Sequence, residues 1–189
     1  DHTRSVSFRQ NGVHTLGEKI VDTTISNISS YHYGGPQFQY SNGRYYLATE
    51  YYWITGERRD GYTVYDDYSA EGGSIYGQYF FNSDATVKIS SKKGKIGGVK
   101  CKAKFGCTAA KFMLESIDTR DGELNGLNGT HGKAIHIGLN HYFNSNVRLM
   151  VDATRGVYLG GHNDFYSDGN RADRRHTMTS IQARLHAKF

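Results

Sequence analysis

The last nine residues of the chain, 181–189, read IQARLHAKF and alternate strictly between apolar and polar positions. Successive side chains of a strand point to opposite faces, so this strand has one apolar and one polar face. Chain ends usually fray, whereas the last strand of an outer-membrane barrel pairs with the first. The ending therefore predicts a barrel whose strand faces lipid on one side and water on the other.

Similar alternation recurs along the chain, in segments separated by clusters of Gly, Asn, Asp and Ser. Most of these segments are long enough for a tilted membrane strand, which takes about 9 to 11 residues. The predicted strands are 3–10, 21–31, 35–41, 44–54, 73–81, 108–117, 133–143, 146–157 and 176–189. The pattern predicts an all-β fold, an antiparallel transmembrane β-barrel with about 8 to 10 strands in this chain.

The connections between these strands differ in length and charge. Residues 40–44 and 143–147 are short polar turns, whereas 56–72, 83–106, 118–132 and 158–175 are longer and more charged. Outer-membrane barrels have short periplasmic turns on one rim and long extracellular loops on the other. We therefore expect the short connections to share one rim and the long ones to share the opposite rim.

Alternation also assigns faces within single strands. One face of 133–143 carries Ile135, Ile137, Leu139, His141 and Phe143, and the other His136, Gly138, Asn140 and Tyr142. In the next strand, one face carries Val147, Leu149, Val151 and Ala153, and the other carries Arg148, Met150, Asp152 and Thr154. In strand 44–54, one face carries Tyr45, Leu47, Thr49, Tyr51 and Trp53, and the other carries Tyr46, Ala48, Glu50 and Tyr52. Aromatic residues near strand ends suit interfacial girdles, although aromatics favour strands in any β protein. The girdle candidates are Tyr79, Phe80, Phe81, Tyr142, Phe143 and Phe189.

Composition and motifs argue against several other classes of protein. The 189 residues include 15 Tyr, 9 Phe and 23 Gly but one Pro, which favours strands and polar loops and argues against a disordered chain. No run reaches the roughly 18 to 20 apolar residues of a transmembrane helix. No G-x-S-x-G nucleophile motif occurs, so we expect no catalytic residues, no cofactor and no enzyme activity. The chain begins at Asp1 without a leader, which leaves a removed secretory signal and an internal start both open.

Two cysteines, Cys101 and Cys107, lie close together in CKAKFGC. In an exported protein the pair can form a disulfide, and in the cytosol it would stay reduced. Two thiols without nearby histidines do not complete a zinc site. Residues 160–176 gather several Asp and His residues without the ligand spacing of a calcium or zinc motif, so we expect a loop there and no metal site. Those residues are His162, Asp164, Asp168, Asp173 and His176.

Several blocks in this order resemble the phosphate-selective porin O and P family. They are VDTTISNISSYHYGGPQFQYSNGRYYLATEYYWI at 21–54, GGSIYGQYFF at 72–81, AAKFMLESIDTRDGELNG at 109–126, AIHIGLNHYFNSNVRLMVDATRG at 134–156, and the terminal RLHAKF. The resemblance implies a passive trimeric porin of about 16 strands in the bacterial outer membrane, with a water-filled channel that often prefers anions. The blocks belong to the family's C-terminal half. Residues 1–189 are accordingly a single barrel domain or the C-terminal half of one, and the half barrel is favoured because a small closed barrel would need a new partner for its closing strand.

Charged residues on the predicted inner faces are the candidate pore lining, namely Lys111, Glu115, Arg148, Asp152, Arg184, His186 and Lys188. The net charge is +5, and a ladder of Arg and Lys in a narrow pore favours anions, although Glu50, Glu115 and Asp152 are expected to face inward too. We therefore hypothesise a channel for small solutes with a mild preference for phosphate-like anions.

Two other functions remain open, a small non-conducting barrel acting as an adhesin or enzyme and a soluble β-sandwich binding module. The expected partners are outer-membrane lipid and lipopolysaccharide, small anionic solutes and two further copies in a homotrimer, with no nucleic acid. Seven Lys between 88 and 104 can bind the phosphates of lipopolysaccharide or belong to a solvated loop.

Overall fold

The computed structural model describes residues 4–11, 19–60, 63–82, 84–90, 95–119, 131–159 and 175–188. Its strands are β1 (Arg4–Asn11), β2 (Lys19–Gly34), β3 (Gln37–Asn42), β4 (Tyr45–Asp60), β5 (Thr63–Phe80), β6 (Ala85–Ser90), β7 (Lys95–Cys101), β8 (Cys107–Asp118), β9 (His131–Tyr142), β10 (Val147–Leu159) and β11 (Arg175–Ala187). Every pairing between these strands is antiparallel, which confirms the predicted all-β antiparallel class.

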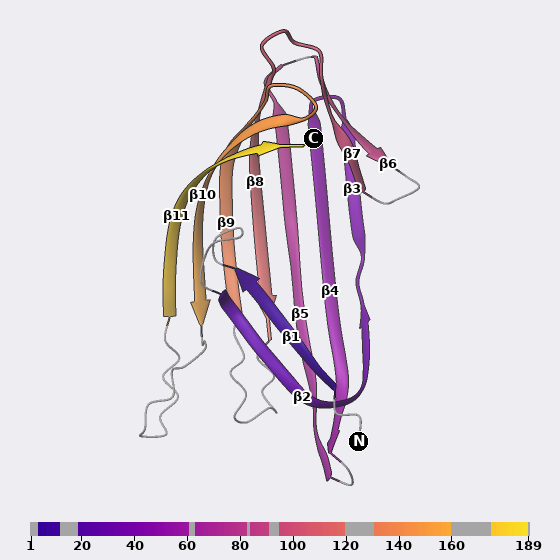
Figure 1. Cartoon of the computed structure of the whole chain (residues 1–189). Helices are drawn as coiled ribbons and strands as arrows, with labels where there is room; N and C mark the ends of the chain where they lie inside the picture. The colour runs from indigo at the N-terminus through magenta and orange to yellow at the C-terminus, as the bar shows by residue number, and fades with distance from the viewer. Residues whose placement is uncertain are drawn as a thin grey trace.

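Nine of the strands form one curved sheet in the order β1-β2-β4-β5-β8-β9-β10-β11, with β3 also paired to β4 (Figure 1). β2 and β3 lie end to end along the same edge of β4, one on each side of the break at residues 35–36. The nine segments predicted from alternation correspond to these nine strands. β6 and β7, which form a separate hairpin, were not predicted.

The connections only partly follow the expected division between rims. We call the end of the sheet with the β3–β4, β5–β8 and β9–β10 connections the turn rim, and the opposite end the loop rim. Residues 56–72 are not a long loop, because β4 and β5 stay paired, with one register shift between Gly56 and Arg58, as far as the pair Asp60 and Thr63. The long connection 83–106 joins two strands at the turn rim, beside the short turns. Consecutive antiparallel strands run in opposite directions, so successive connections of the main sheet alternate between the two rims. The rim on which a connection lies therefore depends on its place in the strand order and not on its length.

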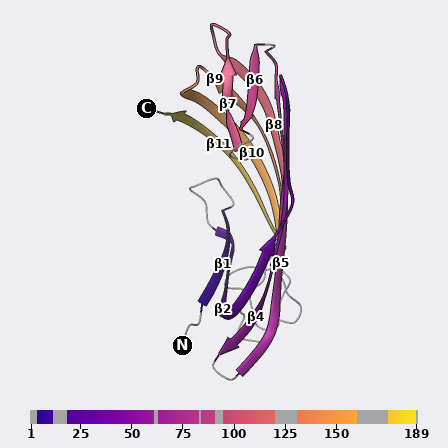
Figure 2. The same ribbon diagram turned by 90° about the vertical axis from the view of Figure 1, so that its right-hand side faces the viewer.

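The sheet is open among the described residues, because β11 pairs only with β10 and β1 only with β2. Seen from the side, it is concave, with β6, β7 and β1 on the concave side (Figure 2). The β1–β2 hairpin turns away from β4 near Asn27, which has a φ of 63°, next to a register shift between Ile28 and Ser30. The architecture is thus a barrel wall that these residues do not close.

The two faces of the wall have opposite character. The outward face carries exposed apolar side chains in the central strands, including Ile137 at 57% exposure, as the alternation predicted. The inward face carries the buried core, which lies between the wall and the β6–β7 hairpin. This core consists of Tyr46, Phe80, Ala85, Val87, Cys107, Ala109 and Tyr142. Among the described residues no second sheet covers the outward face, unlike the two packed layers of a β-sandwich.

The predicted aromatic girdle is partly wrong. Phe80 and Tyr142 are 0% and 7% exposed, because both point inward and are covered by the β6–β7 hairpin. Tyr79, Phe81 and Phe143 lie on the outward side at the turn rim, where Tyr79 packs edge to face against Phe81. Phe189 lies outside the described residues. No helix in the described ranges is long and apolar enough to cross a membrane.

Candidate pore lining and basic cavity

Strand register places two of the predicted pore-lining residues in direct contact. Lys111 of β8 and Asp152 of β10 form an ion pair across β9, with 2.6 Å between Nζ and Oδ1 and side chains 16% and 10% exposed. Both flank Gly138 in the same row of the wall. A Cβ atom on Gly138 would lie 2.3 Å from the Asp152 carboxylate oxygen and 3.1 Å from Lys111 Cε. The glycine therefore makes room for the ion pair, a role that alternation alone did not reveal.

A second acidic residue of the inner face is also engaged. Glu115 of β8 lies 3.1 Å from Nε2 of His136 on β9. The other ring nitrogen of His136 lies 2.8 Å from the Thr154 hydroxyl on β10. Glu115 and His136 are both mostly buried, at 19% and 16% side-chain exposure. The middle of the inner wall is thus a set of matched polar pairs spanning three strands.

On β5 and β9, the inner wall near the turn rim is neutral and hydrogen bonded. The Tyr76 hydroxyl donates to Oε1 of Gln78 at 2.8 Å, and Nε2 of Gln78 donates to the Tyr142 hydroxyl at 3.2 Å. The Asn140 amide lies 3.4 Å from the same hydroxyl. These contacts tie β5 to β9 beneath the hairpin.

Basic residues gather around a cavity of about 240 Å³ between this network and the hairpin. Its lining includes Val87 and Val99 of the hairpin, Arg148 of β10, and His186 and Lys188 at the end of the chain. Arg148 and His186 are direct partners in the β10–β11 register, so their side chains share the inward face.

Arg184 pairs with Met150 one row further along, and it is exposed. Within the described part of the chain, Arg148, Arg184 and Lys188 have no ion-pair partner. Of the seven predicted pore-lining residues, the structure pairs Lys111, Glu115 and Asp152 and gathers the other four, all basic, near the turn rim.

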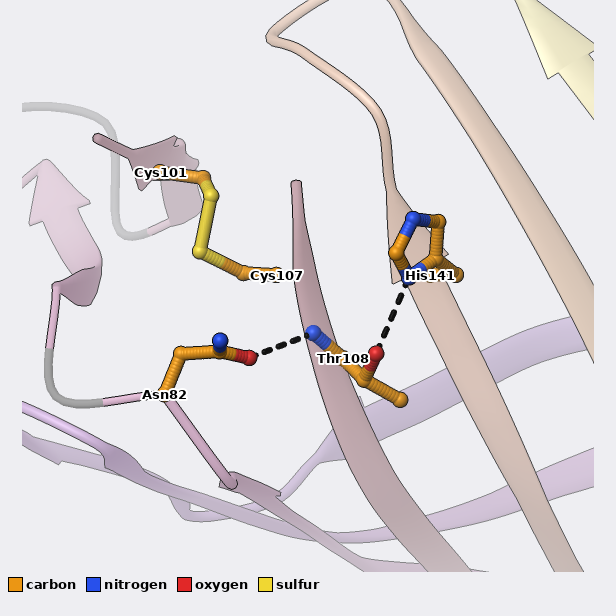
Figure 3. Close-up of a disulfide and its surroundings, with 5 residues drawn as sticks. All are labelled: Asn82, Cys101, Cys107, Thr108 and His141. Atoms are coloured by element: carbon orange, nitrogen blue, oxygen red, sulfur yellow. Dashed lines mark hydrogen bonds between the residues drawn. A yellow bond between two sulfur atoms is a disulfide. The ribbon is translucent and has the colours of Figure 1, made fainter. Parts of the chain in front are cut away.

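The hairpin is fastened to the wall at its base and along β6. Cys101 at the end of β7 and Cys107 at the start of β8, a pair that the sequence left open, are joined by a disulfide (Figure 3). The Asn82 side-chain oxygen accepts from the Thr108 amide at 2.9 Å, and the Thr108 hydroxyl lies 2.9 Å from His141 Nδ1. On β3, the Ser41 hydroxyl donates to the Val87 carbonyl at 2.7 Å. The hairpin thereby narrows the inner side of the turn rim.

Two other sequence-based candidates lie partly outside the described residues. In the lysine-rich stretch 88–104, the described residues 88–90 and 95–104 lie in and after this hairpin at the turn rim. Binding of this stretch to lipopolysaccharide stays a prediction. Of the acidic and histidine residues at 160–176, all but His176 lie outside the described residues. No cluster of three metal-ligating side chains occurs in the ranges that the structure covers.

Comparison with known proteins supports the interpretation of the main sheet as part of a porin barrel. A family model for the phosphate-selective porin O and P matches residues 24–189. Searches of the curated proteins and of the solved structures found no significant match. The match covers every strand of the main sheet except β1 and the start of β2. The chain therefore belongs to the phosphate-selective porin O and P family.

Proposed function

We propose that this protein forms a water-filled channel through which small solutes diffuse passively, with a preference for phosphate-like anions. Family membership implies a porin of the bacterial outer membrane, a channel and not an enzyme. The observation that carries the anion preference is the unequal pairing of charge on the inner wall. Lys111 is matched by Asp152, and Glu115 lies 3.1 Å from His136 Nε2, whereas the cations near the turn rim have no acidic partner among the described residues.

Unmatched cations in a narrow passage act on every ion that passes. Low-dielectric walls focus the field of the lining charges, so a positive cluster lowers the barrier for anions and raises it for cations. The β6–β7 hairpin places apolar side chains of Val87 and Val99 opposite Arg148. Such walls limit the water that can screen the arginine, which supports the turn-rim cavity as the selective part of the passage.

The open sheet also bears on assembly. A strand edge in lipid leaves backbone groups without hydrogen-bond partners, which is costly enough that membrane sheets close. We propose that both free edges, β1 and β11, find partners in a complete barrel and that three such barrels form a homotrimer. The family supports this assembly, and cross-linking of the protein in native membranes would test it.

Ion selectivity in planar lipid bilayers tests the proposed function. With a potassium chloride gradient across the bilayer, we expect a reversal potential that shows chloride preferred over potassium. Arg184→Glu and Arg148→Glu should each shift the potential toward potassium. The control is Lys133→Glu, which makes the same charge change on the outward face and should leave the potential unchanged.

Cation preference in the wild type, or an unchanged potential in both inner-wall variants, would refute the proposed anion preference. Protein that inserts into the bilayer but carries no current would instead favour the non-conducting barrel.

A further inference from the structure

The outward face contains a groove of about 730 Å³ in the half of the wall near the loop rim. Strand register explains its shape. Tyr51, Gly73, Ser116 and Lys133 follow one another in a row across β4, β5, β8 and β9. The two small residues leave a trough between the larger ones. The next row toward the middle of the membrane continues the trough with apolar side chains, which are Ile75, Leu114 and Ile135.

The outward face carries two acidic and two basic residues around this groove, and they are not paired with one another. Glu71 accepts a hydrogen bond from the Tyr51 hydroxyl, and the Asp118 carboxylate lies 2.8 Å from Nδ1 of His131. Lys133 of β9 and Arg155 of β10 also line the groove and are exposed. Neither has an acidic partner in the part of the chain that the structure describes. The groove therefore presents two cations without an ion-pair partner beside an apolar trough, while its carboxylates are engaged by Tyr51 and His131.

These two cations can act on one group. Lys133 pairs with Val157 and Arg155 pairs with Ile135, so the two are diagonal neighbours on the same face. Diagonal neighbours have Cα atoms about 7 to 8 Å apart, and both side chains are long enough to reach a common oxyanion. Arg and Lys are the side chains that bind phosphate most strongly, through charge-assisted hydrogen bonds.

We propose that this groove binds one phosphorylated glycolipid of the lipopolysaccharide class, with an acyl chain along Gly73 and Ser116 and a phosphate held by Lys133 and Arg155. The inference rests on the proposed function, because it requires the outward face to lie in the outer membrane. In that orientation the loop rim faces the outer leaflet, where this lipid resides. The groove volume falls within the range of about 300 to 1,000 Å³ that is usual for ligand sites.

The test uses the full chain folded in detergent and measures retained lipid by native mass spectrometry. The probes are hexa-acylated lipid A with its phosphates, the same lipid without phosphates, and phosphatidylethanolamine. We expect one retained lipid A per chain and much weaker retention of the other two. Lys133→Glu combined with Arg155→Glu should weaken lipid A binding by at least about tenfold, since each charge-assisted bond contributes about one decade or more.

Two further variants separate the groove from general charge effects. Ser116→Phe fills the trough without changing any charge and should also weaken retention of lipid A. Lys100→Glu makes the same charge change on the exposed part of β7 at the turn rim and should leave retention unchanged. If the double charge variant does not fold, Ser116→Phe and the lipid without phosphates still decide the outcome.

Equal retention of lipid A by wild type and Ser116→Phe would overturn the proposal, as would equal retention of the lipids with and without phosphates. It would also be overturned if the groove variants changed the mass of the protein oligomer and not its lipid content, because the groove would then be a contact between copies. Channel conductance, measured separately, should stay at the wild-type value in every groove variant. A protein that conducts but does not retain lipid A refutes the lipid site alone, and a protein that never conducts refutes the proposed function.

Discussion

Asp152→Asn isolates the contribution of one matched charge on the inner wall. The substitution keeps the shape of the side chain but removes the negative charge that lies 2.6 Å from Lys111 Nζ. The lysine then has no ion-pair partner in the described chain, and the wall gains one unit of positive charge. Anions should pass more easily and cations less easily than in the wild type.

The size of this effect follows from Coulomb's law. An ion roughly 8 Å from the carboxylate interacts with it by about 0.5 kcal/mol at the dielectric constant of water and about 2 kcal/mol at an effective value near 20. Salt at 0.1 M roughly halves the lower figure, because the screening length is about 10 Å. Anions gain this energy and cations lose it, so the anion-to-cation permeability ratio should rise by about twofold or more.

Reversal potentials at two salt concentrations measure the change. The shift should be clear near 0.1 M and should nearly vanish near 1 M, where the screening length falls to about 3 Å. Glu71→Gln is the matched control, because it removes one acidic charge from the outward face. The reasoning would be refuted by an unchanged ratio at 0.1 M, by an equal shift at both concentrations, or by an equal shift in the control.

The remaining predictions concern stability, measured by urea unfolding of the protein folded into phospholipid vesicles. Ile137→Arg puts a charge on the lipid face and should cost about 2 to 4 kcal/mol, whereas Gln182→Arg on the inner wall should cost about 1 kcal/mol or less; equal losses would contradict the assignment of faces. Gly138→Ala should cost about 1 to 3 kcal/mol, because its Cβ would lie 2.4 Å from a backbone oxygen on the neighbouring strand; an unchanged unfolding midpoint would show that the wall can relax there. Replacing Cys101 and Cys107 by serine should cost about 2 kcal/mol and expose the hairpin to protease; unaltered protease resistance would mean that the hydrogen bonds and core contacts hold the hairpin unaided.

How much of this protein could be predicted from its sequence depends on the range of the interactions concerned. The nine strands of the main sheet were predictable because the alternation of side chains is local and survives in any barrel. Face assignment succeeded for the same reason, since Ile137 and His136 differ by one position and must point to opposite sides. The family blocks added the porin O and P family, which the match to residues 24–189 confirmed.

The hairpin of β6 and β7 was not predicted, because β6 alternates over only six residues, ATVKIS, and two glycines interrupt the alternation in β7, KIGGVKC. Its packing on the inner wall depends on contacts with residues far away in sequence, such as Ser41 with Val87. Contacts between residues far apart in sequence also explain the wrong girdle assignment of Phe80 and Tyr142, because the hairpin that covers them belongs to another part of the chain. A side chain's position near a strand end does not reveal what covers it.

The sequence by itself determined the strands, their two faces and the identity of the charged residues on the inner wall. The tertiary structure alone decided which of those charges neutralise each other and which remain unmatched. Lys111 and Asp152 are 41 positions apart, and only the register of three adjacent strands brings them within 2.6 Å across a glycine. Charge can be counted along a chain, but electrostatic energy depends on distance, and distance across a sheet is set by long-range pairing.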